Sequence, residues 1–316
     1  MQNPDLNQAV VTRNGPLESL FVTDTTRPPD FSAVIAQLFI YPVKSCAGVA
    51  LGEALLTETG LDLDRAWMVV DETGEFLTQR ELPRMALVQP QVRAHDIVLR
   101  APGMLALHLA IDQVEAAVRV KVWGQEVAAY DMGAIAAQWF SDFLGVKARL
   151  VRFDPEHQRA SSLSWTDGVQ ALNQFSDGYP MLITSEASLA GLNAKLLAAG
   201  QPAVSMSRFR PNIVLGDAPG QEAMAAHDED RLAHVDIATA HSRVRLQPVK
   251  PCPRCPIVNI DPLSASSSPA VNDMLQTYRQ DKRLDGALSF GMNSITLDGF
   301  DQVLKVGQSV TGTYRF

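Results

Sequence analysis

The sequence predicts an α+β protein with a large β component. Most of the chain from about residue 34 onward consists of short runs rich in β-branched and aromatic residues, separated by glycine, proline or aspartate. Three segments depart from this pattern and have the periodicity of amphipathic helices. Strands are expected again after each of them, which indicates helices packed on a β core.

The β-strands are expected in both halves of the chain. In the first half the apolar or alternating runs are SAVIAQLFIYPV, EALLTET, RAWMVVD, GEFLTQ, DIVLRAP, LALHLAI and AAVRVKVWGQEVAAYD. In the second half they are ARLVRF, NIVLGD, AHVDIATAHSRVRLQPVK, CPIVNID, NSITLDG and VLKVGQSVTGTYRF. The close spacing of the runs in the first half favours a curved antiparallel sheet or barrel.

The first helix is expected in MGAIAAQWFSDFLG, where Gly145 is placed to end it. Its apolar stripe is predicted to comprise Ile135, Trp139, Phe140, Phe143 and Leu144. The second is expected in SEASLAGLNAKLLAAG, capped by Ser185 and ended by Gly200. Its predicted stripe is Leu189, Leu192, Leu196 and Leu197. The third is expected in SPAVNDMLQTYR, with Ser268 as cap and Pro269 as the first helical residue.

Length and composition favour two domains in a soluble chain. A chain of 316 residues is large enough for two cores. Residues 1–32 show no sustained period and are expected to be an N-terminal extension, followed by domains at 33–150 and 151–316. The start of the chain lacks the basic and apolar regions of a secretion signal, and no apolar run is long enough to span a membrane. We therefore expect a cytoplasmic protein without a membrane partner.

Charge and cysteine content narrow the possible functions. The formal charge of −8 opposes non-specific binding to nucleic acid, although a local basic pocket would still hold a small anion. Three cysteines are too few to stabilise a chain of this length through disulfides and fit a reducing compartment. The thiols of Cys46, Cys252 and Cys255 must then serve in packing, metal binding or nucleophilic chemistry.

The segment KPCPRCPIVNIDP, residues 250–262, concentrates most of the chemistry. Arg254 lies between Cys252 and Cys255, and a neighbouring cation lowers a thiol pKa. Three prolines stiffen the loop and can hold a sulfur at a fixed point. Four interpretations stay open: a redox dithiol, a structural zinc site, two buried packing thiols, or a single thiolate ligand of a redox metal whose other ligands come from a cofactor.

The run PCPRCPIVNIDP resembles a motif of the MOSC family, named after the C-terminal domain of molybdenum cofactor sulfurase. The similarity is to the branch of the amidoxime-reducing components and their bacterial relatives. Four further segments match that branch in the same order: YPVKSCAG at 41–48, LDLDRAWMVVDETGEFLTQRELPRMALV at 61–88, TSEASLAGLN at 184–193 and FRPNIV at 209–214. The resemblance implies a MOSC β-barrel over 151–316 and a MOSC N-terminal β-barrel domain over 33–150.

The resemblance also implies the site residues. Cys255 would coordinate molybdenum and be the catalytic residue, and a pyranopterin molybdenum cofactor (molybdenum–molybdopterin) would supply the remaining ligands. The residues expected around that cofactor are Lys44, Ser45, Arg65, Ser185, Arg210, Asn212 and Arg254. Arginine offers forked donors to phosphate and ring edges, and Lys44 supplies a point charge. Taken alone, Arg65 and Arg80 have the competing interpretation of solvated residues paired with nearby carboxylates.

The implied activity is the two-electron reduction of N-hydroxylated small molecules, with an oxygen atom removed from the substrate. No iron–sulfur cluster motif follows the last predicted strand, so a separate electron donor of the ferredoxin or flavoprotein type is expected. A second function stays open, in which Cys255 handles a persulfide or holds the cofactor for delivery. The histidines at 227, 234 and 241 form no metal-binding motif and are expected at the surface.

Overall fold

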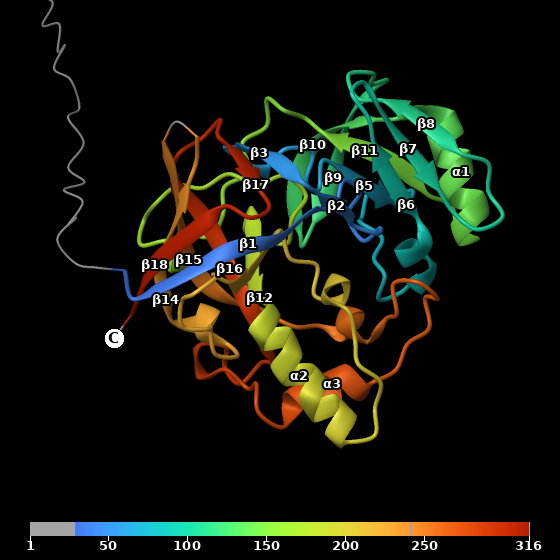
Figure 1. Ribbon diagram of the computed structural model, residues 1–316. Helices are drawn as coiled ribbons and strands as arrows, with labels where there is room; N and C mark the ends of the chain where they lie inside the picture. Colours follow the sequence, from blue (N-terminus) through green and yellow to red (C-terminus); the bar gives the residue numbers. More distant parts are fainter. Residues whose placement is uncertain (1–28, 241, 316) are drawn as a thin grey trace, which may run out of the picture.

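The computed structural model describes residues 29–240 and 242–315 (Figure 1). The predicted extension over 1–32 therefore lies almost entirely outside the described residues. The first strand, β1 (Phe31–Ile40), begins two residues before the predicted start of the first domain at residue 33. The described part is β-rich with three α-helices, as predicted.

The largest sheet of the described residues contains a closed barrel of seven strands. The strands follow the order β1, β13, β12, β16, β15, β14 and β18, and β1 closes the ring because it pairs with both β13 and β18. Closure leaves no unpaired edge within the ring. The bounds of the other six strands are β12 (Met181–Ser185), β13 (Ile213–Asp217), β14 (Leu232–Ala238), β15 (Arg243–Pro253), β16 (Ser289–Asp298) and β18 (Ser309–Tyr314).

Strand β1 shows why the division of the chain at residue 150 stays a prediction. It precedes that boundary by more than 100 residues, yet it lies between two strands of the C-terminal half. Its side chains alternate between buried and half-buried, and Ile35 and Leu38 belong to the main apolar cluster inside the barrel. A short strand, β2 (Val49–Leu51), extends the sheet beside β1.

Three smaller sheets make up the rest of the β-structure. The first has four antiparallel strands: β5 (Trp67–Val70), β11 (Arg149–Phe153), β10 (Gln125–Asp131) and β9 (Ala117–Val122). The second is the meander of β6 (Gln89–Val92), β7 (Asp96–Arg100) and β8 (Leu107–Ala110). The third contains β17 (Val303–Lys305), β3 (Glu53–Thr57) and β4 (Gly60–Leu61).

Helix α1 (Gly133–Leu144) packs beside β11 in the N-terminal part. It ends as predicted at Gly145, which adopts the left-handed conformation with φ of 73°. The predicted stripe is wrong at one position, because the Ile135 side chain is 79% exposed. Ala136 takes that place, since the buried residues follow the i, i+3, i+4, i+7, i+8 series that starts there.

Helices α2 (Glu186–Ala198) and α3 (Ala270–Gln276) pack against each other beside the barrel (Figure 1). Ser185 caps α2 as predicted, but Leu197 lies outside the apolar stripe and is 61% exposed. Helix α3 begins one residue later than predicted, so Pro269 is its N-cap and Ser268 precedes the cap. Within the described residues, no helix is long and apolar enough to cross a membrane.

The segment after Cys255 is not the predicted strand. Strand β15 ends at Pro253, and Pro256–Asn259 forms a short 3₁₀ helix, η5, with Cys255 as its N-cap. Pro256 explains the difference, because its fixed φ suits the first helical position and its missing N–H prevents a ladder hydrogen bond. The strand was predicted from the hydrophobicity of the run IVNI, without the conformational restriction that Pro256 imposes. Cys255 is consequently placed at a sharp turn between strand and helix.

Candidate active site in a cationic cavity

A cavity of about 420 Å³ lies between the N-terminal sheets and the barrel. Trp123 and the segment Phe76–Arg80 line it from the N-terminal side, while Arg208–Asn212 and Cys252–Cys255 line it from the barrel. It brings together all the predicted site residues except one. Those that line it are Lys44, Ser45, Arg65, Arg210, Asn212, Arg254 and Cys255.

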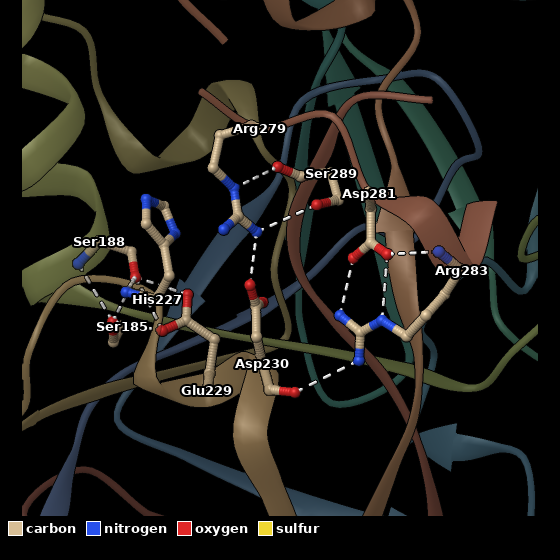
Figure 2. A network of polar contacts seen from close by, with 9 residues as sticks. All are labelled: Ser185, Ser188, His227, Glu229, Asp230, Arg279, Asp281, Arg283 and Ser289. Atoms are coloured by element: carbon tan, nitrogen blue, oxygen red, sulfur yellow. Dashed lines mark hydrogen bonds and ion pairs between the residues drawn. The ribbon is translucent and has the colours of Figure 1, made fainter. Parts of the chain in front are cut away.

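Ser185 is the predicted residue that the structure does not bring to this cavity. Its side chain is fully buried in the network of Figure 2, where its hydroxyl accepts from the Ser188 backbone N–H at 3.1 Å. The same hydroxyl lies 2.8 Å from Oε2 of Glu229. The position follows from its place at the junction of β12 and α2, where the cap turns inward. Ser185 therefore stabilises the start of α2.

Positive charge dominates the cavity wall. Six cationic side chains line it, against a single acidic one, although the whole chain has a formal charge of −8. The cationic residues are Lys44, Arg65, Arg80, Arg208, Arg210 and Arg254, and the acidic residue is Asp177. Lys44, Arg65 and Arg208 each pair with a carboxylate of the protein. Arg80, Arg210 and Arg254 make no ion pair within the described residues, so the wall favours an anionic ligand that would give them a partner.

Two of the predicted arginines contact the same aromatic ring. The guanidinium carbons of Arg65 and Arg210 lie 4.3 and 4.2 Å from the Tyr41 ring centroid. Arg65 also donates to Asp64 at 2.5 Å, and Arg210 donates to the Cys46 carbonyl at 2.6 Å. The ring attracts both like charges, and the neighbouring acceptors fix their orientation. Arg65 thus has the carboxylate partner of its competing interpretation and lines the cavity as well.

Burial shifts the pKa values of this group in a consistent direction. Burial, together with the nearby Arg65 charge, lowers the pKa of Arg210 to about 10. Burial raises the pKa of Tyr41 to about 12 against the opposing effect of both arginines. At neutral pH the phenol is therefore neutral and Arg210 stays charged. An anion in the cavity would relieve the repulsion between Arg65 and Arg210.

Three of the predicted residues have left-handed backbone conformations. The φ angles are 64° for Ser45, 53° for Arg65 and 57° for Arg210. Residues other than glycine rarely adopt this region, and such strain is concentrated at functional sites. The tertiary structure must hold these positions, because none of the three residues favours the conformation by itself.

The Asn212 side chain positions neighbouring groups through hydrogen bonds. Its Oδ1 accepts from the Leu182 backbone N–H at 3.1 Å and from Arg65 at 3.2 Å. Its Nδ2 donates to the Phe39 carbonyl at 3.2 Å. The side chain therefore ties β1, the start of β12 and the Arg65 guanidinium together, and only 1% of the residue is exposed.

Lys44 pairs with an acidic residue that the sequence analysis missed. Its Nζ donates to Asp177 at 2.5 Å and to the Phe175 carbonyl at 2.8 Å. Burial lowers the pKa of Lys44, and Asp177 opposes that effect. Burial would raise the pKa of Asp177, but Lys44 holds it well below its usual range. Because 73% of the Asp177 side chain is exposed, the pairing with Lys44 outweighs the effect of burial.

The cysteine loop places its arginine against the first of the two thiols. Arg254 donates to Cys252 Sγ at 3.2 Å and to the Phe209 carbonyl at 2.5 Å, and its buried Nε has no partner among the described residues. Burial nevertheless raises the pKa of Cys252, with Arg254 opposing it. The expected activation by the neighbouring cation is therefore wrong for Cys252. Cys255 is partly exposed to the cavity and makes no capping bond.

The histidines are not all at the surface. His227 is half-buried against Phe290 and Tyr278, at ring distances of 5.6 and 5.7 Å, and burial lowers its pKa to about 4. The surface prediction is wrong for this residue, and His241 lies outside the described residues. In the described part of the chain, no three His, Cys, Asp or Glu side chains gather closely enough to hold a metal ion.

Two family models match the chain. The MOSC N-terminal beta barrel domain matches residues 32–147, and the MOSC domain matches residues 171–311. The human mitochondrial amidoxime-reducing component 1 is 35% identical over 78% of this chain and 72% of its own length. The rat mitochondrial amidoxime reducing component 2 is 33% identical over 72% of this chain and 67% of its own length.

A third relative is named for a different activity. The zebrafish molybdenum cofactor sulfurase is 30% identical over 74% of this chain, which corresponds to 29% of that longer protein. The similarity to each of the three relatives covers more than 70% of this chain. The chain belongs to the MOSC family and, within it, to the group of two-domain proteins that contains the amidoxime-reducing components.

Proposed function

We propose that this protein is a molybdenum-dependent reductase of N-hydroxylated small molecules. The observation that carries the proposal is the partly exposed Cys255 thiol in a cavity lined by six cationic side chains. The names of the amidoxime-reducing relatives supply the reaction class. The net reaction is R–NHOH + 2e⁻ + 2H⁺ → R–NH₂ + H₂O, with the electrons supplied by a separate ferredoxin or flavoprotein.

The residues present fit a pyranopterin molybdenum cofactor. The cavity volume of about 420 Å³ lies in the usual range for small-molecule sites. The unpartnered Nε of Arg254 and the crowded pair of Arg65 and Arg210 are donors that an anionic pterin phosphate would satisfy. Cys255 is the thiolate donor, and soft sulfur ligands suit a redox metal.

The side chains of the cavity have separate roles in binding the cofactor and in orienting one another. When bound, the cofactor would supply the two-electron chemistry that no protein side chain offers. Lys44 uses two of its three N–H donors on Asp177 and Phe175, so the third can reach a ligand in the cavity. Asn212 orients Arg65, and the Cys46 carbonyl orients Arg210. Asp177 stays ionised at neutral pH and therefore serves as a hydrogen-bond acceptor.

The second candidate is a carrier or sulfur-transfer module. The similarity to molybdenum cofactor sulfurase favours it, and the accessible Cys255 thiol would take up a persulfide or hold the cofactor for delivery. The two functions differ in turnover. A reductase bleaches its visible absorption on reduction and regains it with an N-hydroxylated substrate, whereas a carrier does not cycle.

The test is elemental analysis of the protein purified from a host that makes molybdenum cofactor. We expect close to one molybdenum per chain, its loss in Cys255→Ala, and its partial retention in the matched control Cys252→Ala. Reduction of an amidoxime by the wild-type protein with a chemical electron donor completes the test. Zinc in place of molybdenum, or equal loss in both variants, would overturn the assignment of Cys255.

A further inference from the structure

The hairpin between β9 and β10 has an unexpected residue at its tip. Val122 and Gln125 pair directly, so Trp123 and Gly124 form a two-residue loop, with φ angles of 52° and 78°. A turn with two left-handed residues is normally built from Asn-Gly or Asp-Gly. A bulky aromatic residue at the first position is strained. Interactions outside the hairpin must therefore hold Trp123 in place.

Residues that line the cavity make those interactions. The indole N–H of Trp123 donates to Asp177 Oδ1 at 3.0 Å, although the two residues are 54 positions apart. The Arg80 guanidinium lies 4.6 Å from the Trp123 ring centroid, and the Phe76 ring meets Trp123 edge-on at 5.0 Å. Phe76, Arg80 and Trp123 all line the cavity, and we call them the aromatic wall.

The aromatic wall has ring surface and a positive charge that other described residues leave available to a ligand. Half of the Trp123 surface is exposed, which leaves a large apolar area beside the cavity. Arg80 donates to the Thr78 hydroxyl at 3.3 Å, and in the described residues it makes no ion pair with a carboxylate. The wall therefore combines ring surfaces for stacking with one positive charge that lacks a counterion.

We propose that the aromatic wall determines substrate specificity, favouring N-hydroxylated substrates with a planar aromatic group that bears a negative charge. The proposal rests on the reductase function proposed above. A ring gains stacking area on Trp123 and Phe76, and an anionic substituent on that ring gains the Arg80 charge. A cationic substituent is disfavoured by the same charge. Trp123 and Arg80 are thus specificity-determining residues that act on the substrate.

The experiment compares two aromatic amidoximes of the same size, one with a para-carboxylate and one with a para-aminomethyl group, which is cationic at neutral pH. The measured quantity is the ratio of their kcat/KM values in the cofactor-loaded protein. We expect Arg80→Gln to lower the ratio about fivefold, the upper end of the effect of a single exposed charge pair. Trp123→Asn, which suits the turn, should lower kcat/KM for both aromatic substrates.

Two controls separate specificity from folding. Arg119→Gln removes an exposed positive charge from β9 of the same hairpin without touching the cavity, and we expect it to keep the ratio within about twofold of the wild type. Trp123→Phe keeps a ring but loses the N–H bond to Asp177. If the asparagine variant unfolds, this variant tests the contribution of the aromatic wall to substrate binding in its place. Calorimetric Kd values of the matching amidines, which undergo no reduction, should change in the same order.

The outcomes distinguish this proposal from the proposed function. Hydroxylamine is too small to span the cavity, so its reduction by the wild-type protein tests the reaction alone. Failure to reduce hydroxylamine and both amidoximes would overturn the reductase function. Turnover of all three substrates, with the same ratio and the same amidine Kd values in Arg80→Gln, Trp123→Phe and the wild type, would overturn the role of the aromatic wall and leave the function intact.

Discussion

Arg210 combines three properties that mark a ligand-binding residue. Its φ of 57° is strained, its guanidinium contacts the same Tyr41 ring as that of Arg65, and burial lowers its pKa. Arg210 makes no ion pair within the described residues, so its buried charge has no carboxylate partner there. Its hydrogen bond to the Cys46 carbonyl orients the guanidinium.

At this scale we predict that Arg210→Ala weakens cofactor retention without unfolding the protein. The substitution removes a charge-assisted contact and also relieves repulsion with Arg65, so we expect the cofactor-free melting temperature to change by only a few degrees. The measurement is molybdenum per chain after gel filtration, beside thermal unfolding of the cofactor-free form. Arg210→Lys is the matched control and should retain part of the metal. A collapse of the cofactor-free form would show that Arg210 is structural.

At the scale of elements, the network of Figure 2 joins the start of α2 to η4 (Asp228–Arg231). Both carboxylate oxygens of the fully buried Glu229 contact Ser188, at 2.6 and 2.7 Å, and Ser185 lies 2.8 Å from one of them. No cation pairs with Glu229 among the described residues. Burial raises its pKa to about 7, although the two hydroxyls oppose the shift.

This pKa sets a pH dependence with a defined sign. The folded protein binds the Glu229 proton more tightly than the unfolded chain, so the contribution of Glu229 to stability falls as the pH rises from about 4.5 to about 7. His227 acts oppositely between about 4 and 6.5, because burial holds it neutral in the folded state. The two effects partly cancel in the wild-type protein, so a variant is needed to reveal them.

We therefore predict that Glu229→Gln gains stability relative to the wild type as the pH rises. The difference in unfolding free energy between variant and wild type should grow by roughly 1 to 3 kcal/mol from pH 5 to pH 8, because glutamine does not titrate. Urea unfolding at the two pH values measures it. The exposed Glu58→Gln provides the control, for which we expect no such growth. A difference independent of pH would contradict the raised pKa.

At the scale of the whole molecule, the barrel depends on close approach between β18 and its two neighbours. Gly312 pairs with Phe31 of β1 and with Val235 of β14. A Cβ at this position would collide with the His234 carbonyl oxygen and the Phe31 ring. Only a glycine lets these three strands keep their register at the point where the ring closes.

We predict that Gly312→Ala destabilises the protein by about 1 to 3 kcal/mol, the usual cost of overpacking. The collision is with backbone on one side, which cannot move away as a flexible side chain can. Thermal and urea unfolding measure the loss. Gly52→Ala is the control, because nothing lies within 4 Å of the added Cβ and its φ needs no glycine. Equal stability of the two variants would mean that the strands separate at little cost.

The sequence by itself determined the features that depend on local order along the chain. The α+β class, the Ser185 cap of α2 and the Gly145 end of α1 follow from periodicity and capping, which act within a few residues. The linear motifs also supplied the eight predicted site residues, of which seven line the cavity. Local rules failed where they competed, as at Pro256, which turns an apolar run into a 3₁₀ helix.

Only the tertiary structure decided which distant side chains meet. It closes the barrel with β1, turns Ser185 toward Glu229 and away from the cavity, and brings Asp177 to Lys44 and Trp123. The physical reason is that barrel closure and cavity charge arise from contacts between segments more than 50 residues apart. Hydrophobic period and capping contain no information about such pairs, whereas packing and charge pairing in the folded chain select them.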